Sequence, residues 1–215
     1  MKKDSTLYIL VFITCLTIAF GAGVSVVHHL TRDMLAENEL LHYNRTLARA
    51  FGLEVPGSAA SHYQEAVSGS LDYHELDYEG RSWRIYLMRE VQDSPLGFVF
   101  RGRGVWDVIN GVLVLDHGLE TILSLEFLEQ HETPGLGARI EEDWFRDQFR
   151  GLEISWDRPA NRRIVIGADT GPDSAGRVDA ITGATQTSRA LMDSINRELE
   201  TFRELVREEM PTIKN

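Results

Sequence analysis

Residues 111–128, GVLVLDHGLETILSLEFL, indicate how the folded part of this chain is built. Residues 111–115 are a short apolar run of the kind that forms a buried strand. Residues 116–118 are a turn signal, and residues 121–128 are again rich in apolar and β-branched side chains. We therefore predict two antiparallel strands joined by a tight turn.

Short apolar runs predict further strands on both sides of this hairpin. Residues 84–88 and 97–100 come before it and are separated by a turn signal at residues 93–95. Residues 163–166 form another such run after it. The fold class expected from this order is α+β, with a small twisted antiparallel sheet and flanking helices.

Two helices are predicted to flank the sheet. The shorter one covers residues 141–149, where the apolar side is made by Trp144, Phe145, Gln148 and Phe149. The longer one covers residues 187–208 and has apolar residues at helical spacing. Its buried stripe is expected to consist of Leu191, Ile195, Leu199 and Phe202.

The N-terminal residues have a different composition. Residues 7–27, LYILVFITCLTIAFGAGVSVV, carry no charge and would span roughly 30 Å as a helix, the hydrocarbon thickness of a bilayer. Lys2 and Lys3 precede this run, which favours a cytoplasmic N-terminus with the bulk of the chain beyond the membrane. A cleaved signal peptide is the alternative, because residues 19–22 loosely resemble a cleavage site, although the apolar run continues to Val27.

A further helix is expected after this anchor, over residues 28–53. Apolar residues recur there at helical spacing, and the Pro-Gly-Ser sequence at residues 56–58 is predicted to end the helix. The pattern favours a stalk or a packing helix without a catalytic role.

The composition excludes several classes of function. The formal net charge is −11, which disfavours nucleic acid as a partner. Cys15 is the only cysteine, so this chain alone can form neither a disulfide nor a cysteine-ligated metal cluster. Arginine supplies most of the positive charge, and arginine can bind carboxylate or phosphate through two parallel hydrogen bonds.

The first motif is residues 179–188, DAITGATQTS, at the start of the last predicted helix. Free backbone N–H groups and the positive end of the helix dipole make such a position an anion site. Gly183 and Ala184 keep the backbone accessible to a ligand. Hydroxyl groups gather around them at Thr182, Thr185, Thr187 and Ser188. The alternative is an ordinary helix cap made by Thr187 or Ser188.

The second motif is residues 131–137, HETPGLG, a loop between a strand and a helix. Gly135 and Gly137 would let a planar ring lie against the backbone, and Leu136 would offer an apolar contact. His131 beside Glu132 is too little for a metal site or an acid–base pair, and no metal site is predicted.

The third motif is residues 102–106, GRGVW. It looks like a fragment of a phosphate-binding loop, but it lacks the Gly-Lys-Ser/Thr sequence and the strand–helix unit that such loops require. Trp106 is therefore expected to pack rather than to bind a nucleotide.

Taken in order, these motifs resemble a known family over about residues 97–205. The matching residues are Gly102-x-Gly104-x-Trp106, residues 131–137, Trp144, Gln148-Phe149-x-Gly151 and Thr182-Gly183-Ala184-Thr185-x-Thr187-Ser188. They resemble the FMN-binding subunit of two related complexes. One is the Na⁺-translocating NADH:quinone reductase, where it is the C subunit, and the other is the Rnf electron-transport complex, where it is the G subunit.

The resemblance implies a covalent cofactor. Asp179-x-x-Thr182-Gly183-Ala184-Thr185 looks like the signal that a flavin transferase of the ApbE type reads, and the final Thr is then esterified to the FMN phosphate. Thr185 is the implied attachment residue, and Asp179 is part of the recognition signal. Glu132 and Thr133 are the implied flavin contacts, with Thr133 as the donor, and Trp106 is expected near the ring.

The resemblance also implies a place in a larger assembly. The chain would be a one-electron carrier in an ion-translocating oxidoreductase of the bacterial inner membrane, receiving electrons from an iron–sulfur subunit and passing them to a flavin subunit. It would not be catalytic alone, because it has no dinucleotide fingerprint. The alternatives are a structural or assembly subunit and a stand-alone membrane-anchored FMN reductase module.

These expectations divide the chain into four parts. Residues 1–29 are the transmembrane anchor, and residues 30–96 are a juxtamembrane helix with the first part of the soluble domain. Residues 97–208 are the FMN-binding domain, which is expected to be extra-cytoplasmic. Residues 209–215 are a C-terminal tail.

Overall fold

The computed structural model describes residues 6–167 and 176–213. It consists of two compact units, Met1–His42 and Tyr43–Asn215. Lys2 and Lys3, on which the predicted orientation in the membrane depends, lie outside the described residues, as does the end of the predicted tail at residues 214–215.

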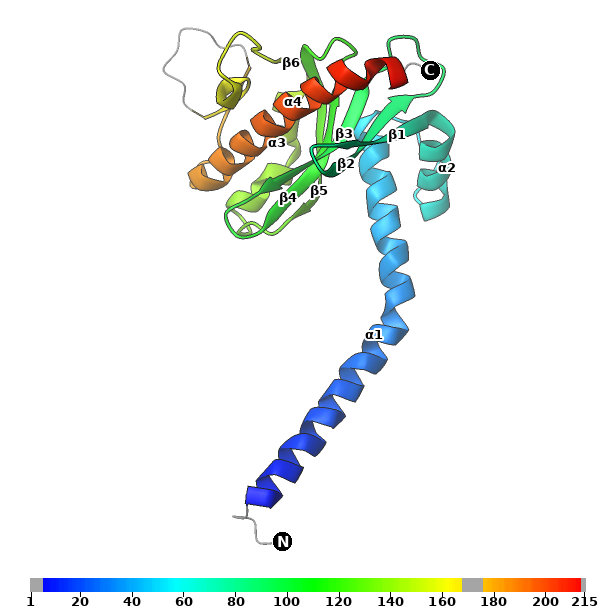
Figure 1. Ribbon diagram of the computed structural model, residues 1–215, viewed down its shortest axis with the longest axis vertical. Coiled ribbons are helices and arrows are strands. Elements are labelled where there is room, and N and C mark those ends of the chain that lie inside the picture. Colours follow the sequence, from blue (N-terminus) through cyan, green and yellow to red (C-terminus); the bar gives the residue numbers. More distant parts are fainter. Residues whose placement is uncertain (1–5, 168–175, 214–215) are drawn as a thin grey trace. The chain divides into compact units, whose positions relative to one another are not determined.

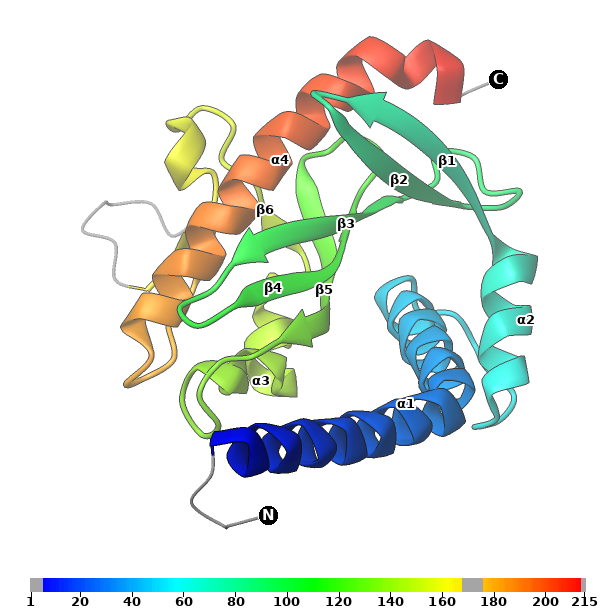
Figure 2. The ribbon, with the colours of Figure 1, turned by 60° about the horizontal axis from the view of Figure 1, so that its bottom comes forward.

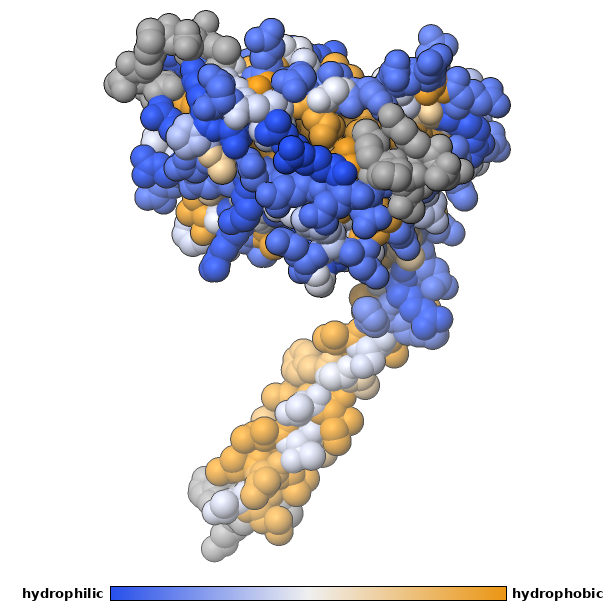
Figure 3. All heavy atoms as spheres, turned by 45° about the horizontal axis from the view of Figure 1, so that its top comes forward, coloured by the Kyte–Doolittle hydropathy of each residue, from blue (hydrophilic) through white to orange (hydrophobic). Residues whose placement is uncertain are grey.

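The N-terminal unit is helical. Helix α1 (Thr6–Ala50) contains the whole apolar run and is long and apolar enough to cross a membrane. The side chains of its apolar window are not buried against other residues. Figure 3 shows the hydrophobic surface that results along this helix. The helix predicted for the apolar run is therefore confirmed.

The end of helix α1 differs from the prediction. The helix stops at Ala50, and Gly52 takes a positive φ of 64°. The N–H of Leu53 donates to the Ala48 carbonyl (2.8 Å), and the N–H of Gly52 donates to the Arg49 carbonyl (3.1 Å). This pair of bonds is a Schellman motif, which favours glycine at the left-handed position. Gly52, and not the Pro-Gly-Ser sequence at residues 56–58, therefore ends the helix.

The second unit is built on one antiparallel sheet whose six strands follow chain order. The strands are β1 (Leu71–Tyr78), β2 (Arg81–Met88), β3 (Leu96–Arg103), β4 (Val108–Leu115), β5 (Thr121–Gln130) and β6 (Leu152–Glu153). The predicted hairpin is confirmed as β4 and β5, which pair in antiparallel register. Helix α2 (Ala60–Ser70) and strand β1 precede the strands that the sequence predicts.

Helix α4 (Thr185–Ile213) covers one face of this sheet (Figure 1). The four side chains of its predicted stripe are all fully buried, as expected. Phe202 stacks on Phe98 of β3, with the ring centroids 4.0 Å apart. Figure 2 shows the same helix next to β3, which it contacts. This apolar face holds α4, and with it the motif at residues 179–188, against the sheet.

The opposite face of the sheet has a second, smaller core. Strand β4 shows the alternation clearly, because Leu113 belongs to the core under α4 while Val112 and Val114 belong to the other. The second core also contains Leu47 and Phe51 from the end of α1. The centre of the sheet is therefore buried on both faces.

The predicted helix over residues 141–149 is wrong in its extent. The segment consists of three short pieces, η1 (Gly137–Glu141), α3 (Asp143–Arg146) and η2 (Asp147–Phe149). Phe145 and Phe149 are fully buried, but Trp144 is 41% exposed. Only two of the four side chains expected on the apolar side thus reach the core, because the short turns do not keep one continuous helical face.

The region after residue 150 contains little regular structure. The strand predicted at residues 163–166 is limited to β7 (Val165–Ile166), which pairs in parallel with β8 (Arg177–Val178). A short turn, η3 (Ala160–Arg162), precedes it. Helix α4 begins two residues before the predicted start and continues beyond the predicted end.

Candidate functional site

The three sequence motifs meet at the side chain of Glu132, which is only 5% exposed. One carboxylate oxygen, Oε1, accepts hydrogen bonds from the backbone N–H groups of Val105 (2.8 Å) and Trp106 (3.3 Å). The other oxygen, Oε2, accepts a hydrogen bond from the Thr187 hydroxyl (2.5 Å). A single buried carboxylate therefore joins the 102–106 loop, the 131–137 loop and the first turn of α4.

Two glycines allow this close approach. A Cβ atom on Gly104 would lie 2.3 Å from Oε1 of Glu132, and one on Gly137 would lie 2.5 Å from the Thr187 hydroxyl oxygen. Both distances are far below van der Waals contact, so a side chain at either position would separate the loops. Gly137 is buried, so it packs inside the junction, whereas the sequence predicted a surface on which a ring could lie.

Thr185 is the first residue of α4, and it is exposed. The turn before it is tight, because Gly183 has a φ of 83° and the N–H of Ala184 donates to the Ile181 carbonyl (3.0 Å). Ile181 and Ala184 are buried, whereas Thr182 is exposed. The turn is therefore anchored by its apolar residues and presents the Thr182 and Thr185 side chains on the surface.

The hydroxyls of Thr187 and Ser188 do not act as an ordinary helix cap. Thr187 donates to Glu132, and Ser188 accepts a hydrogen bond from the backbone N–H of Ile181 (3.3 Å). Both residues are buried. Their side chains hold the turn and the neighbouring loop together, so the helix-cap alternative does not describe these two residues.

Asp179, the first residue of the motif, is exposed, and its backbone is fixed from another element. Its N–H donates to the side-chain carbonyl oxygen of Gln148 in η2 (2.8 Å). The sequence predicted Gln148 on the apolar side of a helix. In the structure its side chain instead accepts this hydrogen bond. The hydrogen bond joins residues 31 positions apart, and nothing in the local pattern predicts it.

Leu136 lies beside the turn that carries Thr185. A Cβ atom on Gly183 would be 3.2 Å from Cδ2 of Leu136, so the glycine leaves just enough room for the leucine. Leu136 is 44% exposed. Gly135, which precedes it, has a φ of 75° and open space around its Cα. An exposed apolar side chain thus lies next to Gly183, two residues before the surface hydroxyl of Thr185.

Trp106, which the sequence predicts to pack and to lie near the flavin ring, is 74% exposed. Its indole N–H donates to the hydroxyl oxygen of Thr133, also exposed (3.0 Å). Glu132 holds the backbone of residues 105 and 106, and the Trp106 ring is therefore left on the surface. Val105 is exposed as well, so the two motif loops present apolar groups to solvent.

Trp144 is held at the surface by a small polar cluster. Its indole N–H donates to Glu142, and Arg139 donates to the same carboxylate (3.1 Å). The hydrogen bond from Arg139 holds the pKa of the Glu142 carboxyl below its ordinary value, and the Trp144 hydrogen bond acts in the same direction. His131 contacts Glu129 (3.2 Å) rather than its neighbour Glu132, so the His131–Glu132 sequence does not form a pair.

Comparison with known proteins shows which class of protein domain the site resembles. Residues 104–200 match the model of the FMN-binding domain family. This segment contains Trp106, Glu132, the loop around Leu136, and the turn that carries Thr185. The part of the chain that forms the site thus matches the FMN-binding domain family, as the resemblance of the motifs indicated.

More particular similarities point to one type of subunit. The chain is 30% identical over 113 residues to the C subunit of the Na⁺-translocating NADH-quinone reductase of Neisseria meningitidis serogroup A, with 51% of this chain and 43% of the relative covered. It is 29% identical over 135 residues to the C subunit from Vibrio alginolyticus, with 61% and 52% covered. The chain thus spans about half the length of the curated relatives that it matches.

The solved structures of such subunits have the same fold. The C subunit from Parabacteroides distasonis superposes with a TM-score of 0.66 and 19% identity, covering 80% of this chain and 94% of that one. NqrC of Shewanella oneidensis gives a TM-score of 0.62 and 17% identity, with 77% and 96% covered. The predicted fold class, an N-terminal apolar helix followed by an α+β domain with an antiparallel sheet, is confirmed.

Proposed function

We propose that this chain is a one-electron carrier subunit that holds FMN covalently through a phosphoester on Thr185. The observation that carries the proposal is the position of this hydroxyl. Thr185 is exposed at the first residue of α4, inside the segment that matches the FMN-binding family and in the turn that resembles a flavinylation signal.

The N-terminus of α4 suits a phosphate group. The first backbone N–H groups of a helix have no partner within the helix and lie at the positive end of its dipole. Thr185, Gln186 and the bare backbone at Gly183 are the residues that would surround the phosphate. The residues present therefore fit a phosphodiester at this position.

The apolar groups beside Thr185 suit a flat aromatic ring. Leu136 and Trp106 are exposed apolar side chains on the two loops that Glu132 joins, and Thr133 lies between them in the sequence. Gly135 offers bare backbone. These residues would contact the ring. Glu132 would not contact it, but would hold both loops in place through its hydrogen bonds. When bound, FMN supplies the one-electron redox chemistry, and the protein positions the ring and sets its surroundings.

The names of the relatives suggest which protein complex this chain belongs to. They are named as subunits of a Na⁺-translocating NADH-quinone reductase, and we propose the same complex for this chain, with the related Rnf complex as the other choice. The partners would be iron–sulfur and flavin subunits of the membrane, with a flavin transferase of the ApbE type during maturation. Helix α1 would anchor the chain in the bacterial inner membrane, N-terminus in the cytoplasm and the second unit in the periplasm.

Intact-mass measurement tests the covalent bond. The full chain is produced together with a flavin transferase, and its mass is expected to rise by that of FMN minus water. Thr185→Ala should abolish the increase, because no oxygen remains to be esterified. Thr185→Ser should retain it. Thr201→Ala, which removes a hydroxyl further along the same helix, is the matched control and should be modified like the original chain.

The same samples distinguish the carrier from a scaffold. On a denaturing gel under ultraviolet light, the original chain and Thr185→Ser should give a fluorescent band, and Thr185→Ala should not. An unmodified original chain beside a transferase that modifies a known substrate would contradict the proposal and favour a structural subunit.

A further inference from the structure

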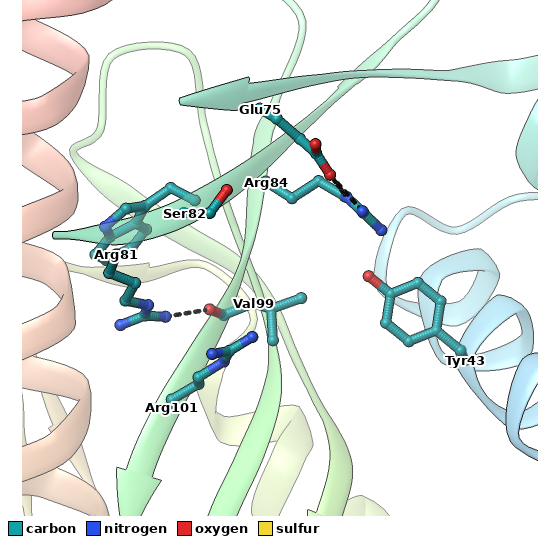
Figure 4. Close-up of a pocket in the computed structure, with 8 residues that line it drawn as sticks. Tyr43, Glu75, Arg81, Ser82, Arg84, Val99 and Arg101 are labelled. Atoms are coloured by element: carbon teal, nitrogen blue, oxygen red, sulfur yellow. Dashed lines mark hydrogen bonds and ion pairs between the residues drawn. The ribbon is translucent and has the colours of Figure 1, made fainter. Parts of the chain in front are cut away.

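A pocket of about 420 Å³ lies in the sheet outside the three flavin motifs (Figure 4). Its volume falls within the range that small-molecule sites usually have. The residues that give it its chemistry come from the end of α1, from β2 and from β3, and they are Tyr43, Arg81, Trp83, Arg84, Val99 and Arg101.

The pocket exists because two neighbouring strands separate. β2 and β3 pair only at Ile85–Phe98, Tyr86–Gly97 and Leu87–Leu96. Beyond these pairs, residues 81–84 of β2 and 99–103 of β3 are not joined to each other, although β1 and β4 stay paired on their outer sides. The pocket occupies this fork and is lined from both strands.

Two of the three arginines in the fork are already held in position. Arg81 donates to both carboxylate oxygens of Glu198 in α4 (2.8 Å each) and to the Val99 carbonyl (3.0 Å). Arg84 is bound to Glu75 of β1. Figure 4 shows Arg81, Arg84 and Glu75 at the pocket. Such fixed guanidinium groups lose little freedom when a ligand binds.

The side chain of the third arginine, Arg101, is not paired with another side chain in the described part of the fold. Its side chain is exposed and lines the pocket, and it forms no hydrogen bond or ion pair with any residue in the described parts of the chain. The whole chain has a formal net charge of −11. A pocket with three arginines and one carboxylate in its lining is therefore a local exception to the acidic character of the protein.

The buried side-chain atoms without a partner at the pocket are both donors. The Nε atom of Arg81 and the indole Nε1 of Trp83 are buried and have no acceptor within residues 6–167 and 176–213. Trp83 is only 3% exposed, and the Arg81 guanidinium lies over its ring at 4.1 Å. Buried donors of this kind normally have an acceptor in protein, water or ligand. The pocket thus combines unsatisfied buried donors with more arginines than carboxylates in its lining.

We propose that this fork is a binding site for a phosphate-bearing anion. A phosphate group offers acceptor oxygens in several directions, which suits guanidinium groups from two strands together with the Ser82 hydroxyl. The phosphate can belong to a free phosphate compound or to an anionic phospholipid headgroup. The site does not contain Thr185, so it stands independently of the proposed flavin attachment.

Calorimetric titration of the full chain in a nonionic detergent tests this site. One arm uses pyrophosphate, and the other uses a short-chain phosphatidylglycerol below its micelle concentration. Arg101→Gln should weaken binding at least about tenfold, since it removes a charge-assisted pair from the ligand and no contact from the fold. Arg150→Gln, which removes a charge that pairs with Asp147 at the surface, is the matched control.

The outcomes separate the two sources of phosphate. Pyrophosphate binding that Arg101→Gln weakens and Arg150→Gln leaves unchanged supports a free phosphate ligand. The same pattern only with the phospholipid supports a headgroup site. Absence of binding to both probes at millimolar concentration would overturn the proposal, and so would an equal loss in the two variants. Thr185→Ala should bind like the original chain, so a failure of the flavin proposal would be recognised separately.

Discussion

At the scale of single residues, the site depends most on Glu132. Its carboxylate accepts hydrogen bonds from two backbone N–H groups and one hydroxyl, and these donors come from two other segments of the chain. Buried donors that lose their acceptor are costly, because nothing replaces the hydrogen bonds that they make with water when the chain is unfolded. Glu132 is therefore the residue that keeps the proposed flavin contacts on the two loops beside Thr185.

Replacing Glu132 by Ala should lower the free energy of unfolding by roughly 2–4 kcal/mol, because three donors are left with poorer partners. Chemical denaturation followed by tryptophan fluorescence measures the change. Glu129→Ala removes an exposed carboxylate three residues away and should change stability by less than about 0.5 kcal/mol. Equal effects of the two substitutions would show that Glu132 does not join the loops.

At the scale of elements, α4 connects the site to the core. Its first residue carries the hydroxyl proposed to hold FMN, while its buried stripe packs on the sheet. Phe202 is fully buried and stacks on Phe98, and it also contacts Trp83 at a centroid distance of 6.2 Å. The position of the first turn thus depends on apolar contacts made several turns further along the same helix.

Phe202→Ala should lower the free energy of unfolding by about 3–5 kcal/mol, since it removes a large buried ring and leaves a cavity. Thermal or urea unfolding of the purified chain measures the loss. Glu204→Ala, two residues along the same helix and exposed, should have an effect within about 0.5 kcal/mol. A small loss for Phe202→Ala would mean that α4 is not held by this stripe.

At the scale of the whole molecule, the chain joins two units with different surroundings. Met1–His42 presents unburied apolar side chains, whereas Tyr43–Asn215 has its own cores on both faces of a sheet. A long apolar helix is stable within a bilayer, and a domain with buried faces is stable in water. The first unit contains the apolar run, and the division into an anchor and a soluble domain stays a prediction.

The anchor can be tested by fractionation. The full chain should stay with membranes after alkaline carbonate washing, because residues 7–27 remain in the bilayer. A variant that begins at residue 43 should be found in the soluble fraction and should still be modified at Thr185 by a flavin transferase. Mass analysis of the membrane-bound chain should include residues 7–27. Their absence would instead identify a cleaved signal peptide.

The sequence by itself determined the elements with a clear period and the identity of the motifs. The α4 stripe follows from residues spaced three or four apart, and the β4–β5 hairpin follows from two apolar runs around a turn. The resemblance of the motifs to a known family indicated the FMN-binding domain, and Thr185 stays its predicted attachment residue. These features are local, since the residues that define each one are neighbours in the chain.

Only the tertiary structure decided how the motifs meet. The bond from Thr187 to Glu132 joins residues 55 positions apart, and the exposed position of Trp106 results from backbone donors that have no signature in the sequence. The arginine fork likewise arises where β2 and β3 stop pairing. Strand register and the approach of distant loops depend on packing and hydrogen bonds between segments that are far apart in the sequence. A local sequence pattern does not contain that information.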